Sequence, residues 1–448
     1  MGRKDSLISW GGFSIAALLL FCVACSGGAP DIPPTPKVYE SPGGQISTYT
    51  LYFQEGCHFG GAVDIEDDIL VAGAPCWAQP PGEAAGSALV IRRSPAGELQ
   101  KEATLIASDR DDGFQYDQHF GESVALNGTL IAIGASGYDD PQAGDNTGAV
   151  YIFEYDGHTW VETGKLTPSR PTPGAKFGRS LALDGDLLAV AGAPEAGSAI
   201  IFQRAAGGWR EMAELPVTVS ADGEAPYVLL DLYGGTLALS TISWQEPVNE
   251  ADLPSIRTTG IVSLYERTGD EWKQTFQTAP QEASLFRMYT ESPFGLPISL
   301  GGEAGKASWL AVGKPGFTGS GRETGSVAIY ERGDRGWKPQ AELVLAPGEL
   351  VPGALPFFGP DPDVIFFGAF VEIEGNRLAV VSTFANTAYV FERLGTDWIY
   401  RLRIIPVDEG GDPDDFQRRT TAMSGNNLLM GSPGELGGGE VYLFNLPP

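Results

Sequence analysis

Three near-copies of one segment stand in the first half of the chain, and they constrain its fold more than any other feature. They read FGGAVDIEDDILVAGAP at 59–75, FGESVALNGTLIAIGAS at 120–136 and FGRSLALDGDLLAVAGAP at 177–194. Each copy holds two apolar runs around a polar turn, which predicts an antiparallel hairpin because such turn residues tolerate a positive φ. We place the three turns at Glu66-Asp67, Asn127-Gly128 and Asp184-Gly185.

A third apolar run follows each hairpin and recurs seven times along the chain. The seven copies are ALVI at 88–91, VYIF at 150–153, AIIF at 199–202, VSLY at 262–265, VAIY at 327–330, AYVF at 388–391 and VYLF at 441–444. Weaker copies of the hairpin precede the last four runs, at 227–240, 294–315, 367–383 and 416–433. In five copies a tryptophan marks the turn before a fourth strand: Trp160, Trp209, Trp272, Trp337 and Trp398.

Seven units of four short antiparallel strands predict an all-β fold, a seven-bladed β-propeller over residues 47–448. The last unit ends after VYLFNLPP and has no fourth strand of its own, whereas STYTLYF at 47–53 is a strand without a unit before it. We therefore expect this N-terminal strand to join the last blade and close the ring, which removes an exposed sheet edge. The 60 glycines and 33 prolines suit such a turn-rich chain.

The charge of the chain excludes one class of partner. The formal net charge is −28, whereas nucleic-acid-binding proteins present a basic surface. We expect no nucleic-acid partner, and the charge is compatible with bound cations or basic partners.

The first 25 residues have the pattern of a targeting segment. Arg3 and Lys4 precede an apolar run at 14–24, which is short for a transmembrane helix. The run ends at Ala24-Cys25, which resembles a bacterial lipoprotein cleavage box and implies a lipid on Cys25; ordinary secretory cleavage is the alternative. Residues 26–46 are rich in Pro and Gly and predict a tether. We thus expect an exported lipoprotein, attached to a membrane by its lipid alone and facing the periplasm or the cell exterior.

Units with an FG…GAP pattern in sets of seven resemble FG-GAP propellers, the fold of the integrin alpha-subunit head and of many bacterial surface proteins. The resemblance covers about residues 47–448 and is strongest in the first three units. It implies an extracellular interaction domain rather than an enzyme.

Two cysteines remain in the body of the protein, Cys57 and Cys76. With the first turn at Glu66-Asp67, paired residues have numbers that sum to 133, and these two cysteines then face each other. Their separation across the hairpin would suit a disulfide, which an exported chain permits. Two free thiols are the alternative.

The calcium loops of the integrin relatives lie between the two hairpin strands, where this chain has mostly two-residue turns. Only GGEAGKAS at 301–308 is longer there, and it has a single carboxylate. Two other acidic loops are weak candidates for Ca²⁺, because oxygen-rich turns can bind it. One contains Asp139, Asp140 and Asp145, and the other contains Asp109, Asp111, Asp112 and Asp117. Solvated turns are the alternative, and no cofactor is certain.

The order of the strands predicts which face binds. The loops after the GAP strand and between blades all lie on one face, here named the top face, and they are the long ones. Exposed aromatic and acidic residues on such loops favour recognition, although some rings could instead fill gaps between blades. The candidates are Trp77, Tyr116, His119, Tyr138, Asp139, Asp140, Trp244, Glu246 and Phe317. The longest of these loops is 241–260.

Known catalytic motifs are not found in the sequence, and its three histidines, His58, His119 and His158, form no such pattern. We therefore expect a non-enzymatic envelope protein that recognises a protein or glycan partner. A polysaccharide-active hydrolase or lyase on the same scaffold is one alternative, and a passive envelope scaffold is another.

Overall fold

The computed structural model describes residues 37–41, 44–53, 58–75, 86–109, 118–192, 198–217, 227–245, 255–279, 281–286, 297–303, 305–315, 325–345, 367–382, 387–404, 420–433 and 439–447. These residues lie in one compact unit, Pro34–Pro448. Every regular element among them is a β-strand, and no helix in this part of the chain is long and apolar enough to cross a membrane.

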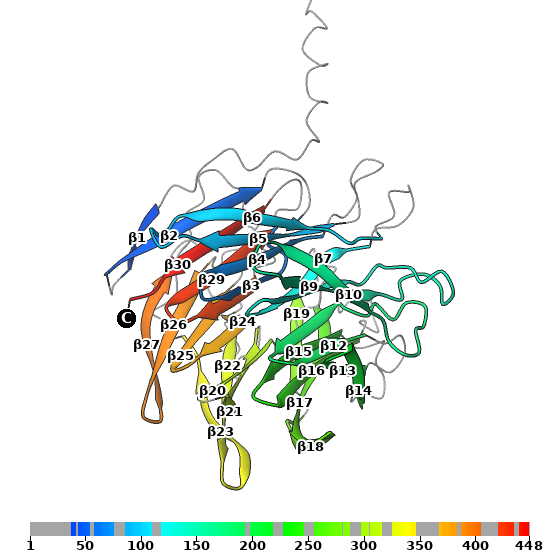
Figure 1. Ribbon diagram of the computed structural model, residues 1–448. Helices are drawn as coiled ribbons and strands as arrows, with labels where there is room; N and C mark the ends of the chain where they lie inside the picture. The colour runs from blue at the N-terminus through cyan, green and yellow to red at the C-terminus, as the bar shows by residue number, and fades with distance from the viewer. Residues whose placement is uncertain are drawn as a thin grey trace, which may run out of the picture. The chain divides into compact units, whose positions relative to one another are not determined.

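The strands form seven antiparallel sheets, the blades of a propeller (Figure 1). Blade one holds β3 (Val63–Glu66), β4 (Ile69–Ala74), β5 (Ser87–Arg93) and β6 (Leu99–Leu105). Blade two holds β7 (Phe120–Asn127), β8 (Leu130–Ala135), β9 (Ala149–Tyr155) and β10 (Trp160–Leu166). Blade three holds β11 (Ser180–Asp184), β12 (Leu187–Ala191), β13 (Ser198–Ala205) and β14 (Gly208–Pro216).

Blade four holds β15 (Tyr227–Tyr233), β16 (Thr236–Gln245), β17 (Ser255–Thr268) and β18 (Glu271–Gln277), with β19 (Gln281–Phe286) paired to β17. Blade five holds β20 (Ile298–Glu303), β21 (Lys306–Lys314), β22 (Ser326–Gly333) and β23 (Gly336–Leu343). Blade six holds β24 (Phe367–Glu374), β25 (Arg377–Ser382), β26 (Thr387–Leu394) and β27 (Asp397–Ile404).

Blade seven closes the ring with both ends of the chain. Its strands are β28 (Thr420–Ser424), β29 (Asn427–Pro433) and β30 (Gly439–Asn445), followed by β2 (Gly44–Phe53) and β1 (Lys37–Ser41) from the N-terminal end. Thr48 pairs with Phe444 and Phe53 with Gly439, so the blue strand β2 lies beside the red strand β30 in Figure 1. The predicted closure by 47–53 is confirmed, and β1 extends the sheet by one further strand.

The apolar core lies between neighbouring blades. Seven clusters of buried side chains each combine residues of two adjacent blades, one cluster for each junction of the ring. Trp160, Trp337 and Trp398 are buried in three of these clusters. The tryptophans that mark the third turn therefore pack one blade against the previous one.

The first hairpins have a register different from the predicted one. Glu66 pairs with Ile69, so the first turn is Asp67-Asp68, and the paired numbers sum to 135 rather than 133. The turns in blades two and three likewise lie one residue later, at 128–129 and 185–186, with a positive φ at Gly128 and Gly185. The prediction centred each turn on the polar pair, but glycine occupies the first turn position because that position requires the positive φ.

The arithmetic that set Cys57 opposite Cys76 does not hold in this register. Both cysteines lie outside the described residues, so the disulfide stays a prediction. The segment 301–308 is also corrected. It is mostly strand, because β20 runs to Glu303 and β21 starts at Lys306, with a register shift after Gly301 in place of a long loop.

The FG and GAP glycines meet at the junctions between blades. A Cβ on Gly73, Gly134, Gly313 or Gly431 would collide with the carbonyl oxygen of the FG glycine in the next blade, at 121, 178, 368 or 60. Those FG glycines have φ between 85° and 96°, a range that favours glycine. The motif is thus a backbone contact between blades, and its phenylalanines, Phe59, Phe120, Phe177 and Phe367, are fully buried beside it.

The contact between GAP and FG glycines is missing at the junction of blades three and four. Its strand β12 places Ala191 opposite Ser180, so Ala191 takes the position of the contact glycine, and its own GAP lies one residue later. Blade four, which follows, has Tyr227 rather than an FG pair at the start of β15. The loss of the glycine and the loss of its partner therefore occur at the same junction.

At the face of the propeller opposite the FG glycines, a row of arginines joins the third strands of neighbouring blades. Arg267 Nη2 donates to Gln203 Oε1 of the preceding blade over 3.2 Å. Arg204 reaches Glu154, and Arg332 reaches Glu266, in the same way. Arg93 of blade one contacts Asn445 of blade seven. In the third strands β13 and β17, the residue directly before the arginine is the one that accepts a bond from the arginine of the following blade. Two adjacent sequence positions, one acceptor and one donor, therefore link successive blades.

Candidate functional site

The up-and-down strand order places the connections between second and third strands, and those between blades, at the top face. The hairpin turns between first and second strands, and those between third and fourth strands, lie at the bottom face. Two of the top connections are described in full: 136–148, between β8 and β9, and 167–179, between β10 and β11. They belong to blades two and three and hold the described part of the candidate site.

A mixed cluster of polar groups lies at the top ends of three consecutive inner strands. Glu122 is on β7, Arg179 directly precedes β11, and Tyr227 begins β15. Arg179 Nε lies 3.6 Å from Glu122 Oε1, and its guanidinium lies 4.3 Å from the centre of the Tyr227 ring. His119 Nδ1 lies 3.7 Å from Glu122 Oε2. We name these four residues the mouth cluster.

Glu122 is held in its ionised form. Burial by itself raises the pKa of this carboxyl, but hydrogen bonds from His119 and Ser136 and the charge of Arg179 together lower the pKa below its ordinary value. The side chains of Glu122, His119 and Arg179 remain 17%, 22% and 28% exposed. The mouth cluster therefore combines an anionic acceptor with cationic and aromatic groups that solvent reaches.

His119 owes its place to the backbone before the FG pair. It has a φ of 53°, and His58 and Lys176, which precede the FG pairs of blades one and three, have values of 49°. The carbonyl of His119 accepts a bond from the Glu122 N–H over 3.0 Å. This tight turn carries the histidine back toward the glutamate side chain, and positive φ values outside glycine are uncommon enough to mark a constrained site.

Tyr138 has a role in packing. The Lys165 ammonium lies 3.2 Å from the centre of the Tyr138 ring and 2.7 Å from Asp109 Oδ2. The Tyr151 hydroxyl donates to Asp109 Oδ1 over 2.7 Å. The Lys165 ammonium thus joins the end of blade one to blade two, and the Tyr138 ring makes a cation–π contact with it.

The same contacts account for Asp109, the first of the weak calcium candidates. Burial raises its pKa, but Lys165 and Tyr151 outweigh burial and lower the pKa overall. The other members of that loop, Asp111, Asp112 and Asp117, lie outside the described residues. Within the described part of the chain, no three His, Cys, Asp or Glu side chains are arranged to bind a metal ion.

Asp139 and Asp140 stabilise their own loop. Asp140 Oδ1 accepts the backbone N–H groups of Gln142 and Ala143 over 2.8 and 2.9 Å. Asp139 Oδ1 accepts the N–H of Asn146 over 2.6 Å. The Asp140 bonds are those of an Asp-initiated turn, and the Asp139 bond joins the two ends of the loop. These contacts agree with the alternative interpretation given for this acidic loop above.

Five top-face candidates remain: Trp77, Tyr116, Trp244, Glu246 and Phe317. Trp77, Tyr116, Glu246 and Phe317 lie outside the described residues, as does Cys25. The segment 241–260, predicted as the longest top loop, is instead largely strand, because β16 runs to Gln245 and β17 starts at Ser255. Trp244 lies on β16, where its backbone pairs with Thr258. The structure brings His119 into the mouth cluster, but Glu122, Arg179 and Tyr227 were not predicted. The sequence does single out Glu122 and Arg179, because the residue directly after the FG pair differs among the three copies: Gly61, Glu122 and Arg179.

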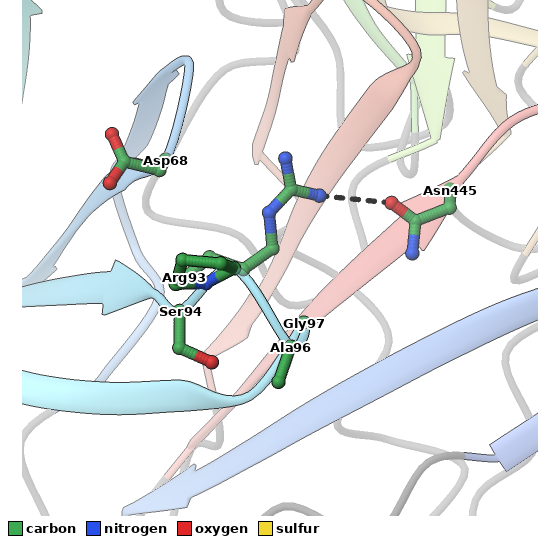
Figure 2. Close-up of a pocket in the computed structure, with 7 residues that line it drawn as sticks. Asp68, Arg93, Ser94, Ala96, Gly97 and Asn445 are labelled. Atoms are coloured by element: carbon green, nitrogen blue, oxygen red, sulfur yellow. Dashed lines mark hydrogen bonds between the residues drawn. The ribbon is translucent and has the colours of Figure 1, made fainter.

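The bottom face carries a shallow pocket of about 440 Å³ where blade one meets blade seven. Figure 2 shows Arg93 directed across it to Asn445, beside the turn Ser94–Gly97 and opposite Asp68. Arg93 Nη1 donates to Asn445 Oδ1 over 3.0 Å and to Asn427 Oδ1 over 2.7 Å. Because Arg93 occupies the same position as the arginines that link the other blades, this pocket is a feature of ring closure.

Comparison with known proteins agrees with this architecture. Residues 99–153 and 160–202 match the family described as the FG-GAP repeat. These stretches run from β6 to β9 and from β10 to β13, so each match begins on the outer strand of one blade and ends on the third strand of the next. The chain is a seven-bladed β-propeller that carries FG-GAP repeats.

Solved structures resemble the chain in fold alone. A chain of the mitotic checkpoint complex has a TM-score of 0.50 with 11% identity, over 100% of both chains. The WD40 domain of coronin from Toxoplasma gondii has a TM-score of 0.46 with 10% identity, over 90% of this chain and 87% of that one. The polysaccharide lyase Uly1 has the same TM-score and identity, over 87% and 90%. No curated protein matches the sequence.

Proposed function

We propose that this propeller is a non-enzymatic recognition module of the cell envelope that binds a glycan or protein partner through its top face. The observation that carries the proposal is the mouth cluster. It gathers an ionised carboxylate, a guanidinium, an imidazole and a phenol at the ends of three inner strands while leaving them partly exposed. Rigid strands hold these groups in position for contact with a partner.

A glycan is the partner that this chemistry favours. Sugar hydroxyls both donate and accept hydrogen bonds, and Glu122 and Arg179 offer one acceptor and one set of donors side by side. Arg179 stacks on Tyr227 and contacts Glu122, which orients the guanidinium before any ligand arrives. A protein partner would use the same groups within a larger contact that includes the loops.

The enzyme alternative receives less support from the same residues. A glycoside hydrolase needs two carboxyl groups, one of them protonated at neutral pH by a raised pKa. The pKa of Glu122 is lowered instead. A lyase would require His119 or Tyr227 to remove a proton from the substrate, and an assay for new reducing or unsaturated ends tests this directly.

The passive scaffold alternative needs a broad apolar patch on the rim. The large apolar side chains that are exposed among the described residues are Ile106, Val161, Val344, Leu394 and Ile399. They are distributed over blades one, two, five and six. Single exposed apolar residues of this kind are ordinary for a soluble surface and require no partner.

Export and lipid attachment at Cys25 belong to the same proposal. They are tested by labelling cells with a fatty-acid analogue and comparing wild type with Cys25→Ser. A labelled, membrane-associated wild type and an unlabelled variant would support the anchor. Equal labelling of both would contradict it.

Recognition is tested by titrating envelope polysaccharide fractions and envelope proteins into the purified propeller, with Arg179→Ala and Glu122→Gln as variants. Lys338→Ala on the exposed strand β23 is the matched control. Binding by wild type and control but about tenfold weaker binding by both variants is expected for loss of one charged hydrogen bond. Equal binding by all four proteins would show that the partner does not contact the mouth cluster.

A further inference from the structure

Three carboxylates occupy one equivalent position on the inner strands of three blades. Asp64 on β3, Asp231 on β15 and Glu372 on β24 are each third from the end of their strand, opposite Val71, Ala238 and Ala379. Asp64 interacts electrostatically with Asp231, and Glu372 with both. Blades one, four and six are separated around the ring, so side chains from all three approach one another only where the inner strands converge on the axis.

Two of these carboxylates also join one blade to the next. Asp64 Oδ2 accepts the N–H of Leu126 on the following inner strand over 2.7 Å, and Asp231 Oδ2 accepts the N–H of Leu300. Ser299, in the equivalent position of blade five, accepts the N–H of Ile373 over 2.9 Å. These N–H groups lie on the free edge of each inner strand, where no further strand bonds them, so the side chains complete the ring of inner strands.

A lower row repeats the arrangement at the hairpin turns. Glu66 accepts the N–H of Gly128, Asp184 that of Gly234 over 2.7 Å, and Glu374 that of Gly425 over 3.5 Å. In blade seven Ser424 performs the same role toward Asp67. The same position supplies the acceptor in all four blades, and three of these four acceptors are carboxylates.

No cation compensates these carboxylates within the inner strands. The strands β3, β7, β11, β15, β20, β24 and β28 contain eight acidic residues, Asp64, Glu66, Glu122, Asp184, Asp231, Glu303, Glu372 and Glu374, and no Lys, Arg or His. The charged groups that act on the three carboxylates are Glu66, Asp184 and Glu374, all acidic. Arg179 lies at the mouth, and Lys306 and Arg377 begin second strands at the bottom.

We propose that Asp64, Asp231 and Glu372 form a proton-controlled brace, which holds the propeller ring firmly when they are protonated and loosens it when all three are ionised. Protonation removes the repulsion across the axis but leaves a carbonyl oxygen to accept each edge N–H. The bonds between blades therefore survive, and only the repulsion changes. The brace is independent of the mouth cluster and of any ligand.

The three residues are half-buried, and the partial loss of solvent and the neighbouring acids agree with this geometry. Desolvation is the largest cause in each case: it raises the pKa of Asp64 to about 7, that of Asp231 to about 6, and that of Glu372 well above its ordinary value. A carboxyl with a raised pKa binds its proton more tightly in the folded protein. Its contribution to stability is complete below the unfolded pKa and is lost as the pH rises through the folded values near 6 and 7.

The test is thermal unfolding of the full chain between about pH 5 and about pH 8. We expect the wild-type Tm to be higher at the acidic end by about 5 °C. Asp64→Asn with Glu372→Gln removes two charges and keeps an oxygen acceptor at each site, so the variant should gain Tm at the alkaline end and lose most of the slope. Glu271→Gln on the exposed outer strand β18 is the control for net charge and should keep the wild-type slope.

Hydrogen exchange provides a second measurement that does not depend on reversible unfolding. The edge amides of Leu126 and Leu300 should exchange faster at the alkaline end in wild type than in the double variant, after correction for the intrinsic rate. A wild-type slope retained in the double variant would overturn the proposal, and so would equal corrected exchange in the two proteins. Because neither readout involves a ligand, failure here leaves the recognition proposal untouched.

Discussion

Arg93 of blade one donates a hydrogen bond from its Nη1 atom to Asn445 Oδ1 of blade seven over 3.0 Å, and this bond joins the two ends of the ring. The same nitrogen bonds Asn427 on β29. Arg204, Arg267 and Arg332 make the corresponding contacts at other junctions. Ring closure therefore repeats the side-chain contact that links consecutive blades, although it brings together residues from opposite ends of the chain.

Replacing Arg93 by alanine should weaken the closure. The variant leaves two amide oxygens without their donor, and the expected loss in free energy of unfolding is about 1–2 kcal/mol for a partly exposed charged contact. Urea unfolding followed by tryptophan fluorescence measures it. Lys273→Ala on the exposed strand β18 should change little, and an Arg93→Ala protein as stable as that control would mean that the contact contributes nothing to closure.

Removing the N-terminal strands should expose a sheet edge. A chain that starts at residue 54 lacks β1 and β2, so β30 presents free N–H and C=O groups to other molecules. We expect a lower Tm and association of the shortened chain, measured by calorimetry and light scattering. A chain that starts at residue 34 keeps both strands and should behave as wild type. Equal behaviour of the two shortened chains would show that β2 is dispensable.

The FG glycines should be sensitive to any side chain. In Gly121→Ala the new Cβ would collide with the carbonyl of Ser87, at a φ of 96°. Gly128 has a φ of 60° but nothing within 4 Å of an added Cβ. Gly128→Ala should therefore cost about 1 kcal/mol from the backbone alone, and Gly121→Ala about 3 kcal/mol or more. Chemical unfolding compares the two, and equal losses would show that the junction accommodates a methyl group.

The mouth cluster should respond to pH with the opposite sign from the axial carboxylates. Since the folded pKa of Glu122 is lowered, its ionised form stabilises the protein at neutral pH, and this contribution is lost as the pH falls through the folded pKa. Glu122→Gln should cost about 1–3 kcal/mol near neutral pH, and the difference from wild type should shrink in acid. A difference that stays constant with pH would mean that the loss arises from packing rather than charge.

The mouth cluster could be only partly predicted from the sequence. His119 was selected because it precedes an FG pair, and Tyr138 because it lies in a top-face loop, where its ring also contacts Lys165. Glu122, Arg179 and Tyr227 come from three different blades. Nothing in the local sequence of one blade indicates that their side chains meet, because that depends on how consecutive inner strands converge at the axis.

The sequence alone determined the repeat, the number of blades, the strand order and the closure of the ring, since these follow from apolar periodicity and turn residues that act within a single hairpin. The tertiary structure decided the register of the first hairpins, the contact between FG and GAP glycines, and the electrostatic interaction among three carboxylates of the inner strands. These features arise from close approach between residues far apart in the chain. Backbone collisions and charge repulsion between blades depend on distance in space, which no local pattern in the sequence encodes.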